Sequence, residues 1–287
     1  MFLSFRASCL AALLWIGLAG GALADPPLVR WLVLDFPPYH MVAGTQQELG
    51  LRDKYLRALQ SDLPQFRHST EFASVARMSG LMQAAEPVCT LSQLKTPERE
   101  AYALFARRPY GHQLPVRLIT HPHTVARNIA LQQEPVSLRR LLTSTSLTLG
   151  LVEKRRFGTA LDELLENELS KQVVRFSSDT LLPAQIKLME HGRFDLTLGY
   201  ALEVEWLRQH DPKVKPVVYL PLAESDVLIP VYVSCARGET GEAVMAAVNA
   251  LPPNSVAQQT LKREYEAMLP KPERSRYRKL VERLGDN

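Results

Sequence analysis

The chain contains few cysteines and lacks the short motifs that assign a chemistry directly. Its 287 residues include three cysteines, and no G-x-S-x-G, H-E-x-x-H, C-x-x-C or glycine-rich phosphate loop occurs. The sequence therefore gives no direct sign of a serine hydrolase, a zinc protease, a dithiol oxidoreductase or a P-loop enzyme. A His-Pro-His stretch at residues 121–123 has no acidic or cysteine neighbour, so neither a metal nor a cofactor is expected.

Neither sign of charge is in large excess, and apolar residues are not scarce. The chain has 34 basic and 30 acidic residues, a net charge of +4, and 46% hydrophobic residues. This composition argues against general disorder. In residues 271–287 basic side chains are interleaved with acidic ones, which is typical of a solvated helix. We therefore expect no nucleic-acid partner.

Residues 1–24 have the features of a cleaved export signal. Arg6 supplies a positive charge, residues 9–18 form an apolar run too short to span a bilayer comfortably, and residues 22–24 read Ala-Leu-Ala. The alternative is an uncleaved membrane anchor; the position of Cys9 at the start of the apolar run argues against a lipid-modified cysteine. No later segment has 18 uninterrupted apolar residues. We therefore expect a soluble, periplasmic protein.

Removal of the signal leaves two cysteines, Cys89 and Cys235. An oxidising compartment favours a disulfide between them. The alternative is two separately buried thiols.

Short apolar runs alternate with segments of helical periodicity along the rest of the chain. Strands are expected at residues 28–34, 87–91, 114–120, 146–152, 172–177, 194–200, 215–222 and 227–235. Helices are expected at residues 51–59, 74–85, 159–169 and 183–192, and in three stretches after Gly241. For the helix at 183–192, Asp179 or Thr180 is the expected N-cap and Gly192 the expected stop. Strands that alternate with helices predict an α/β fold, here in two similar halves.

Five stretches, in order, resemble the periplasmic solute-binding proteins of the polar amino-acid type, family 3. They are WLVLDFPPY (31–39), GLRDKYLRAL (50–59), KTPERE and FARRPY (95–110), LMEHGRFDLTLG (188–199) and VYVSCARG (231–238). The resemblance implies a two-lobed, periplasmic-binding-protein-like (type II) α/β fold, with a parallel or mixed sheet in each lobe and a two-strand hinge. Lobe 1 would comprise residues 25–115 and 234–287, and lobe 2 residues 116–233. Both remaining cysteines would then lie in lobe 1, where a disulfide leaves lobe movement free.

The resemblance also implies ligand-binding positions in lobe 1. Arg99, in the Thr-x-x-Arg segment, would grip a ligand carboxylate, with Thr96 beside it; a guanidinium matches a carboxylate with two parallel hydrogen bonds. The alternative for Arg99 is a surface salt bridge to a neighbouring glutamate. Phe36 and Tyr39 occupy the family's aromatic positions after the first strand, where rings can cover a ligand. Core packing is the alternative for both.

In lobe 2 the departures from the family pattern are informative. Arg156 lies in a basic turn before the helix at 159–169, where backbone N–H groups favour an anion; an exposed basic turn is the alternative. The family's acid for a ligand amino group falls five positions after Asp195, where this chain has Tyr200. Loss of the acid and gain of bases predict a small anionic or carboxylated ligand.

Three functions follow from the resemblance. The first is an exported, monomeric binding protein that closes two lobes over its ligand for uptake by a membrane transporter. The second is a ligand-sensing partner of a membrane signalling protein. The third is an enzyme resembling cyclohexadienyl dehydratase, with Glu98 or Glu153 as the acid. Neither glutamate is a persuasive acid, so no catalytic residue is assigned.

Overall fold

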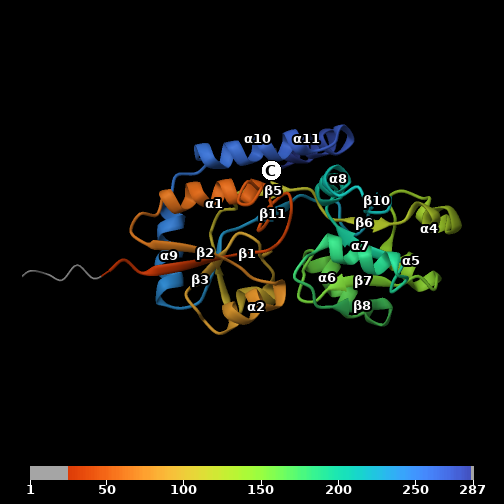
Figure 1. Ribbon diagram of the computed structural model, residues 1–287, viewed down its shortest axis with the longest axis horizontal. Helices are drawn as coiled ribbons and strands as arrows, with labels where there is room; N and C mark the ends of the chain where they lie inside the picture. Colours follow the sequence, from red (N-terminus) through yellow and green to blue (C-terminus); the bar gives the residue numbers. More distant parts are fainter. Residues whose placement is uncertain (1–24, 286–287) are drawn as a thin grey trace, which may run out of the picture.

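The computed structural model describes residues 25–285, and the expected signal at 1–24 lies outside them. Two five-stranded sheets form the cores of two lobes that lie side by side in Figure 1. No helix among the described residues is both long and apolar enough to cross a membrane.

The first sheet has the strand order β2-β1-β3-β12-β4. Its strands are β1 (Leu28–Val33), β2 (Arg67–Phe72), β3 (Val88–Thr90), β4 (Ala103–Phe105) and β12 (Ser234–Ala236). The helices of this part of the chain are α1 (Leu51–Ser61), α2 (Val75–Gln83), the short α3 (Pro97–Glu100) and α9 (Glu239–Ala250). Strand β1 pairs in parallel with β2 and β3, whereas β12 is antiparallel to β3 and β4. The apolar run that predicts β1 is buried because helices cover the sheet.

The second sheet has the order β10-β6-β9-β7-β8. Its strands are β6 (Arg117–Thr120), β7 (Leu149–Val152), β8 (Val173–Phe176), β9 (Leu196–Gly199) and β10 (Val218–Pro221). Its helices are α4 (Pro122–Arg127), α5 (Leu138–Ser144), α6 (Thr159–Glu166), α7 (Leu182–Glu190) and α8 (Ala201–His210), with 3-10 turns at Ile129–Leu131 and Ser170–Gln172. Strand β7 is parallel to β8 and β9, and β6 is antiparallel to β9 and β10.

Two further strands connect the sheets. Strand β5 (Gly111–Gln113) leads from the first sheet to the second, and β11 (Ile229–Val231) leads back. They pair antiparallel as a separate two-stranded sheet. This arrangement confirms the predicted α/β fold with a mixed sheet in each lobe and a two-strand hinge.

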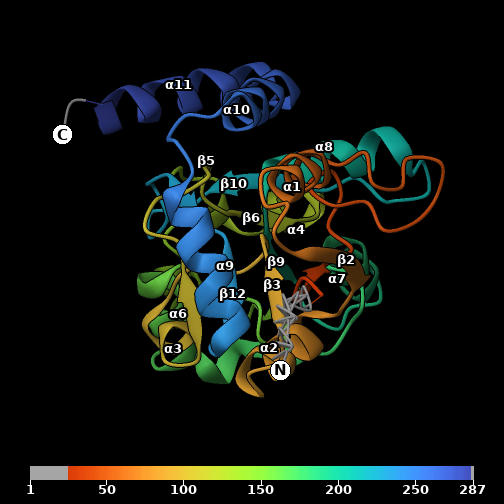
Figure 2. The same cartoon turned by 90° about the vertical axis from the view of Figure 1, so that its left-hand side faces the viewer.

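The last two helices lie over the hinge. Helices α10 (Val256–Met268) and α11 (Lys271–Gly285) run along the top of the molecule, above α1 and β5, in two perpendicular views (Figures 1 and 2). The Tyr265 hydroxyl accepts a hydrogen bond from the Leu114 backbone N–H at 2.8 Å. Buried Arg117 of β6 donates to both carboxylate oxygens of Glu273 in α11, at 2.5 Å. The predicted C-terminal helix is thus present, with one face packed on the hinge.

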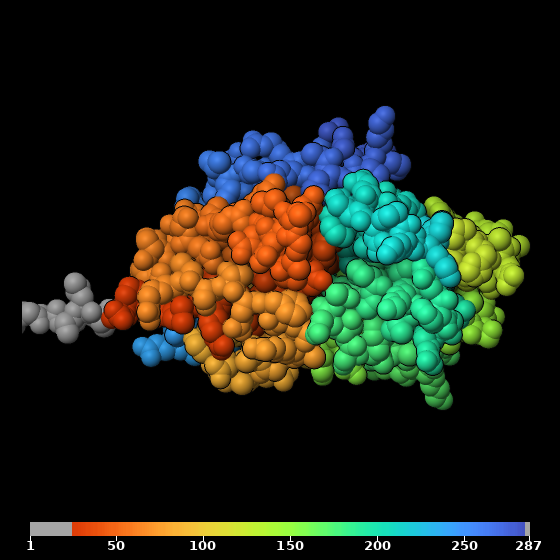
Figure 3. Space-filling view, viewed as in Figure 1, coloured from red at the N-terminus to blue at the C-terminus, as the bar shows by residue number. Residues whose placement is uncertain are grey.

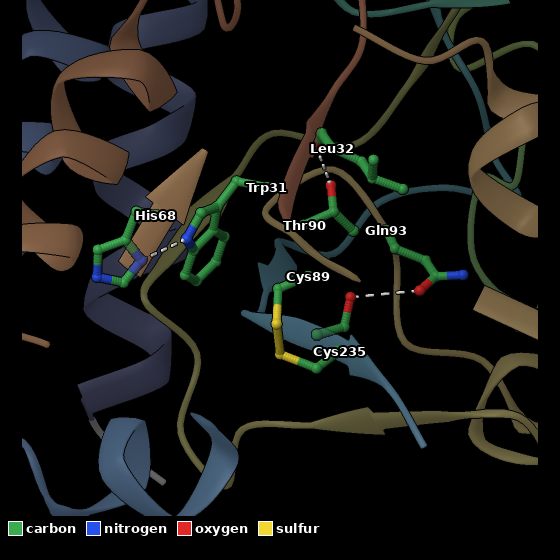
Figure 4. The surroundings of a disulfide bond; sticks show 8 residues. Trp31, Leu32, His68, Cys89, Thr90, Gln93 and Cys235 are labelled. Atoms are coloured by element: carbon green, nitrogen blue, oxygen red, sulfur yellow. Dashed lines mark hydrogen bonds between the residues drawn. A yellow bond between two sulfur atoms is a disulfide. The ribbon is translucent and has the colours of Figure 1, made fainter. Parts of the chain in front are cut away.

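A disulfide joins Cys89 and Cys235, as the oxidising compartment predicts. The two residues face each other across β3 and β12, with Cα atoms 4.0 Å apart. Figure 4 shows their surroundings, where Thr90 donates a hydrogen bond to the Leu32 carbonyl at 2.7 Å. The bond closes a sequence separation of 146 positions, worth about 4–5 kcal/mol of unfolding free energy in the chain-entropy account.

One capping prediction is wrong. Helix α7 follows Leu181, and neither Asp179 nor Thr180 caps it. Thr180 instead forms an isolated parallel bridge with Asp35 of the other lobe, which holds the backbone before the helix extended. Gly192, the expected stop, has a left-handed φ of 68° just after the helix.

Candidate functional site

Three of the predicted aromatic residues meet where the lobes face each other. Phe36 and Tyr39 stack with ring centroids 4.5 Å apart, and each centroid lies 6.0 Å from that of Tyr200. All three side chains are buried. Tyr200 comes from the residue after β9 and the other two from the turn after β1, so the cluster joins both lobes. Burial raises the pKa of Tyr200 to about 12, so its hydroxyl stays protonated.

The start of α1 positions this aromatic turn. Asp53 accepts hydrogen bonds from the backbone N–H of Met41 and of Gly50, at 2.9 and 3.0 Å. The Arg52 N–H donates to the Tyr39 carbonyl at 2.8 Å. A Cβ on Gly50 would lie 2.4 Å from that same carbonyl oxygen, so only glycine permits the contact.

Arg99 points into the junction between the lobes. Its side chain donates to the Leu94 carbonyl at 3.0 Å and, across the junction, to the Lys154 carbonyl at 3.0 Å. Thr96 caps α3 by accepting from the Arg99 N–H at 3.4 Å, so its hydroxyl holds the backbone that carries the guanidinium. Burial lowers the pKa of Arg99, and the charge interaction with nearby Tyr102 opposes this shift.

Arg156 also crosses the junction. Its guanidinium pairs with Glu98 of α3, to which Nε donates at 2.9 Å, and with Glu166 of α6. Burial opposes the charge on Arg156, but the hydrogen bonds to Glu98 and Glu166 outweigh it and raise its pKa. The predicted basic turn is therefore an inter-lobe contact.

The residue beside Arg156 is more deeply buried. Arg155 donates to Glu203 at 2.9 Å and to Gln185 at 3.0 Å. Its guanidinium carbon lies 5.5 Å from the Phe36 ring centroid and 5.8 Å from that of Tyr200. This cation therefore lies among the aromatic rings.

Glu203 is an acid that the family pattern does not identify in this chain. It lies three residues after Tyr200, at the start of α8, and accepts from the Tyr200 N–H at 2.8 Å. Burial raises its pKa, and the nearby Arg155 guanidinium opposes that rise. A capping acid after a predicted strand is the signal that could have identified it.

Arg52 is a second cation that the resemblance does not identify. Its guanidinium donates to Gln113 of β5 at 2.7 Å and lies 4.8 Å from the Tyr39 ring centroid. The side chain is buried. The apolar periodicity of α1 does not predict that Arg52 is buried.

A cavity of about 40 Å³ remains between the lobes. None of its lining residues within 25–285 is an aspartate or a glutamate. Four of them are arginines: Arg52, Arg99, Arg155 and Arg156. A space of this size holds water but not a typical ligand, because small-molecule sites span about 300–1,000 Å³. In the face shown in Figure 3 the two lobes touch along most of their junction. The structure is therefore a closed arrangement whose cavity is lined by four arginines, two of which, Arg155 and Arg156, pair with glutamates.

An acid with a raised pKa lies near Arg156 and Arg99, two of the arginines that line this cavity. Asp162 of α6 accepts from the N–H groups of Phe157 and Gly158, at 2.9 and 3.2 Å. Burial raises its pKa to about 6, against the effect of these N–H groups and of Arg156.

The acids named for a dehydratase-like reaction have other environments. Glu98 is bound by Arg156, and exposed Glu153 accepts from the Ser177 hydroxyl at 2.7 Å. His121 and His123 stack with ring centroids 5.3 Å apart. Within residues 25–285 no three histidine, cysteine, aspartate or glutamate side chains are grouped to hold a metal ion.

Comparison by sequence found no matching family model and no matching curated protein. Comparison of structures found the same fold. The substrate-binding protein of an amino acid ABC transporter is 17% identical, with a TM-score of 0.57, over 84% of this chain and 96% of that chain. An arginine-specific periplasmic binding protein of Salmonella typhimurium is 16% identical (TM-score 0.57; 84% and 97%). The sensor domain of a histidine kinase is 14% identical (TM-score 0.60; 84% and 93%). These likenesses confirm the predicted periplasmic-binding-protein-like fold.

Proposed function

We propose that this protein binds a small anionic or carboxylated solute between its two lobes. The observation that supports this most is the lining of the inter-lobe cavity, in which four arginines occur without an acid among the described residues. Arg155 and Arg156 have glutamate partners, whereas Arg99 donates to carbonyl oxygens. A ligand carboxylate would satisfy the same N–H groups of Arg99 with a full opposite charge.

Ligand entry requires the lobes to separate. The cavity of the closed arrangement is too small for a carboxylic acid with a side chain. The contacts that hold the lobes together include the Arg99–Lys154 hydrogen bond, the Arg156–Glu98 pair and the aromatic cluster of Phe36, Tyr39 and Tyr200. The Arg156–Glu98 pair involves a half-exposed carboxylate, and such pairs contribute about 0–1 kcal/mol. Opening about β5 and β11 would break this pair at small cost, would separate the Tyr200 ring from Phe36 and Tyr39, and would expose Arg99 to solvent. The lobes that move are those expected from the sequence, 25–115 with 234–287, and 116–233.

In this proposal Phe36, Tyr39 and Tyr200 cover the apolar part of the solute and Arg99 and Arg156 hold its acid group. Thr96 keeps Arg99 in place. The protein is exported to the periplasm, acts without chemistry on its ligand and passes it to a membrane transporter. The alternative is a ligand-sensing partner of a membrane signalling protein, and the fold shared with a histidine kinase sensor domain supports it.

A thermal-shift screen of residues 25–287 tests this function. The panel holds dicarboxylates, aromatic acids, sugar acids, and neutral and cationic amino acids. An acid present at 100 times its dissociation constant should add about 2.7 kcal/mol of unfolding free energy. Arg99→Met should abolish that gain. Stabilisation by lysine or arginine and by no acid would contradict the proposal.

A further inference from the structure

A second cavity lies on the other side of the aromatic turn, beneath α10 and α11. Its volume is about 390 Å³, roughly ten times that of the inter-lobe cavity and within the range of small-molecule sites. Residues from α1, β5, β11, α10 and α11 line it. We call it the rear pocket.

The wall of the rear pocket is rich in aromatic ring surface. It includes four tyrosines: Tyr39, Tyr110, Tyr265 and Tyr277. Two of their hydroxyls have short hydrogen bonds to the backbone, Tyr110 to the Leu91 carbonyl at 2.7 Å and Tyr265 from the Leu114 N–H at 2.8 Å. Since these two hydroxyls are hydrogen-bonded to the backbone, the rings of Tyr110 and Tyr265 offer the pocket their apolar surface. Such a wall suits a flat, apolar ring.

Arg52 supplies a buried positive charge to the same pocket. It is 4% exposed, and no aspartate or glutamate within residues 25–285 lies at ion-pair distance from it. Arg117 and Arg155, which are equally buried, each pair with a glutamate. A buried charge without a counter-ion is costly, so a chain that retains one has a reason to do so. An anionic ligand would provide the missing counter-ion.

The remaining polar groups of the rear pocket agree with an anion. Exposed Lys262 of α10 adds a second positive charge, and none of the lining residues that the structure describes is acidic. Burial, and then the charge of Lys262, lower the pKa of His112. At neutral pH this imidazole is therefore uncharged and can donate or accept a hydrogen bond.

We infer that the rear pocket is a second ligand site, which binds an aromatic monocarboxylate with its ring against the tyrosines and its carboxylate on Arg52. The inference does not depend on ligand binding between the lobes, because the rear pocket is bounded by α10 and α11. Arg52 and Gln113 line both cavities, so a variant specific to the rear pocket must change another residue.

Lys262→Glu is that variant, and Arg263→Glu is its matched control. Both residues are exposed and adjacent in α10, but only Lys262 lines the rear pocket, whereas Arg263 donates to Thr260. Calorimetric titration with phenylacetate should show binding to the wild-type protein and to Arg263→Glu alike. Lys262→Glu should weaken that binding at least about fivefold through charge repulsion. Arg99→Met should leave it unchanged.

Three results would overturn the inference. They are no binding of phenylacetate by the wild-type protein at millimolar concentration, equal weakening by Lys262→Glu and Arg263→Glu, and loss of binding in Arg99→Met alone. The last would place phenylacetate between the lobes, which would support the proposed function while removing the second site. Because Lys262 and Arg263 are both exposed, both variants should fold, and the comparison between them remains decisive.

Discussion

Arg155 and Glu203 form a buried ion pair, 2.9 Å long, in the part of lobe 2 that faces the aromatic turn of lobe 1. The guanidinium lies near three rings, those of Phe36, Phe157 and Tyr200. The guanidinium of Arg155 thus lies among these rings and neutralises Glu203. Because Glu203 is neutralised by Arg155, it is not free to bind a ligand's amino group, which is consistent with an anionic ligand.

Removing one member of this pair should be costly. Glu203→Gln leaves Arg155 buried without a counter-charge, and breaking a buried pair in this way costs about 3–5 kcal/mol. Urea denaturation measures the loss. The matched control is Glu168→Gln, whose pair with Arg139 is exposed and should contribute less than about 1 kcal/mol. Equal losses for the two variants would contradict the role given to the buried pair.

The disulfide should stabilise lobe 1 without restricting the hinge. Replacing Cys89 and Cys235 together by alanine should lower the unfolding free energy by about 2–5 kcal/mol. Ligand affinity at a temperature where the variant is folded should stay the same, because both residues belong to the first sheet. A change in affinity larger than about threefold, with the fold intact by circular dichroism, would show that the disulfide affects lobe closure.

Asp162 should make the unfolding free energy fall as pH rises from about 4 to about 6. Its pKa is raised from 3.8 to about 6 in the folded chain, so the folded state binds the proton more tightly than the unfolded state. The resulting loss of unfolding free energy is absent below pH 4 and complete above pH 6, where it reaches about 3 kcal/mol.

Asp162→Asn provides the comparison, since asparagine does not titrate. The unfolding free energy of the wild-type protein minus that of the variant should increase as pH is lowered from 7 to 4. A difference that is constant with pH, or that decreases, would show that the Asp162 carboxyl is not destabilised by burial.

The sequence predicts the central strands well because their signal is local. The apolar run at residues 28–34 indicates the strand β1. In the same way, the glycine-led segment at residues 50–59 indicates the helix α1. Strand β2 escapes prediction because it is a polar edge strand, RHSTEF, with much of its surface exposed. The helix α8 is missed because its start at Ala201 follows β9 with no intervening turn signal.

The site is predicted less completely because charge pairing is not local. Arg99 of the Thr-x-x-Arg segment lies at the junction, and Phe36 and Tyr39 meet Tyr200 there. The partner of Arg155, however, lies 48 positions away in the chain. Apolar periodicity reports which face of an element is buried, but it does not report which buried charge has a counter-ion. The ligand roles of these residues remain predictions.

A crystal structure of the protein with the acid that stabilises it most in the thermal-shift screen tests the central claim most directly. We predict that the acid lies between the lobes, with its carboxylate within hydrogen-bond distance of the Arg99 guanidinium and the Lys154 carbonyl displaced from it. An acid bound elsewhere, with the Arg99–Lys154 contact intact, would contradict the account.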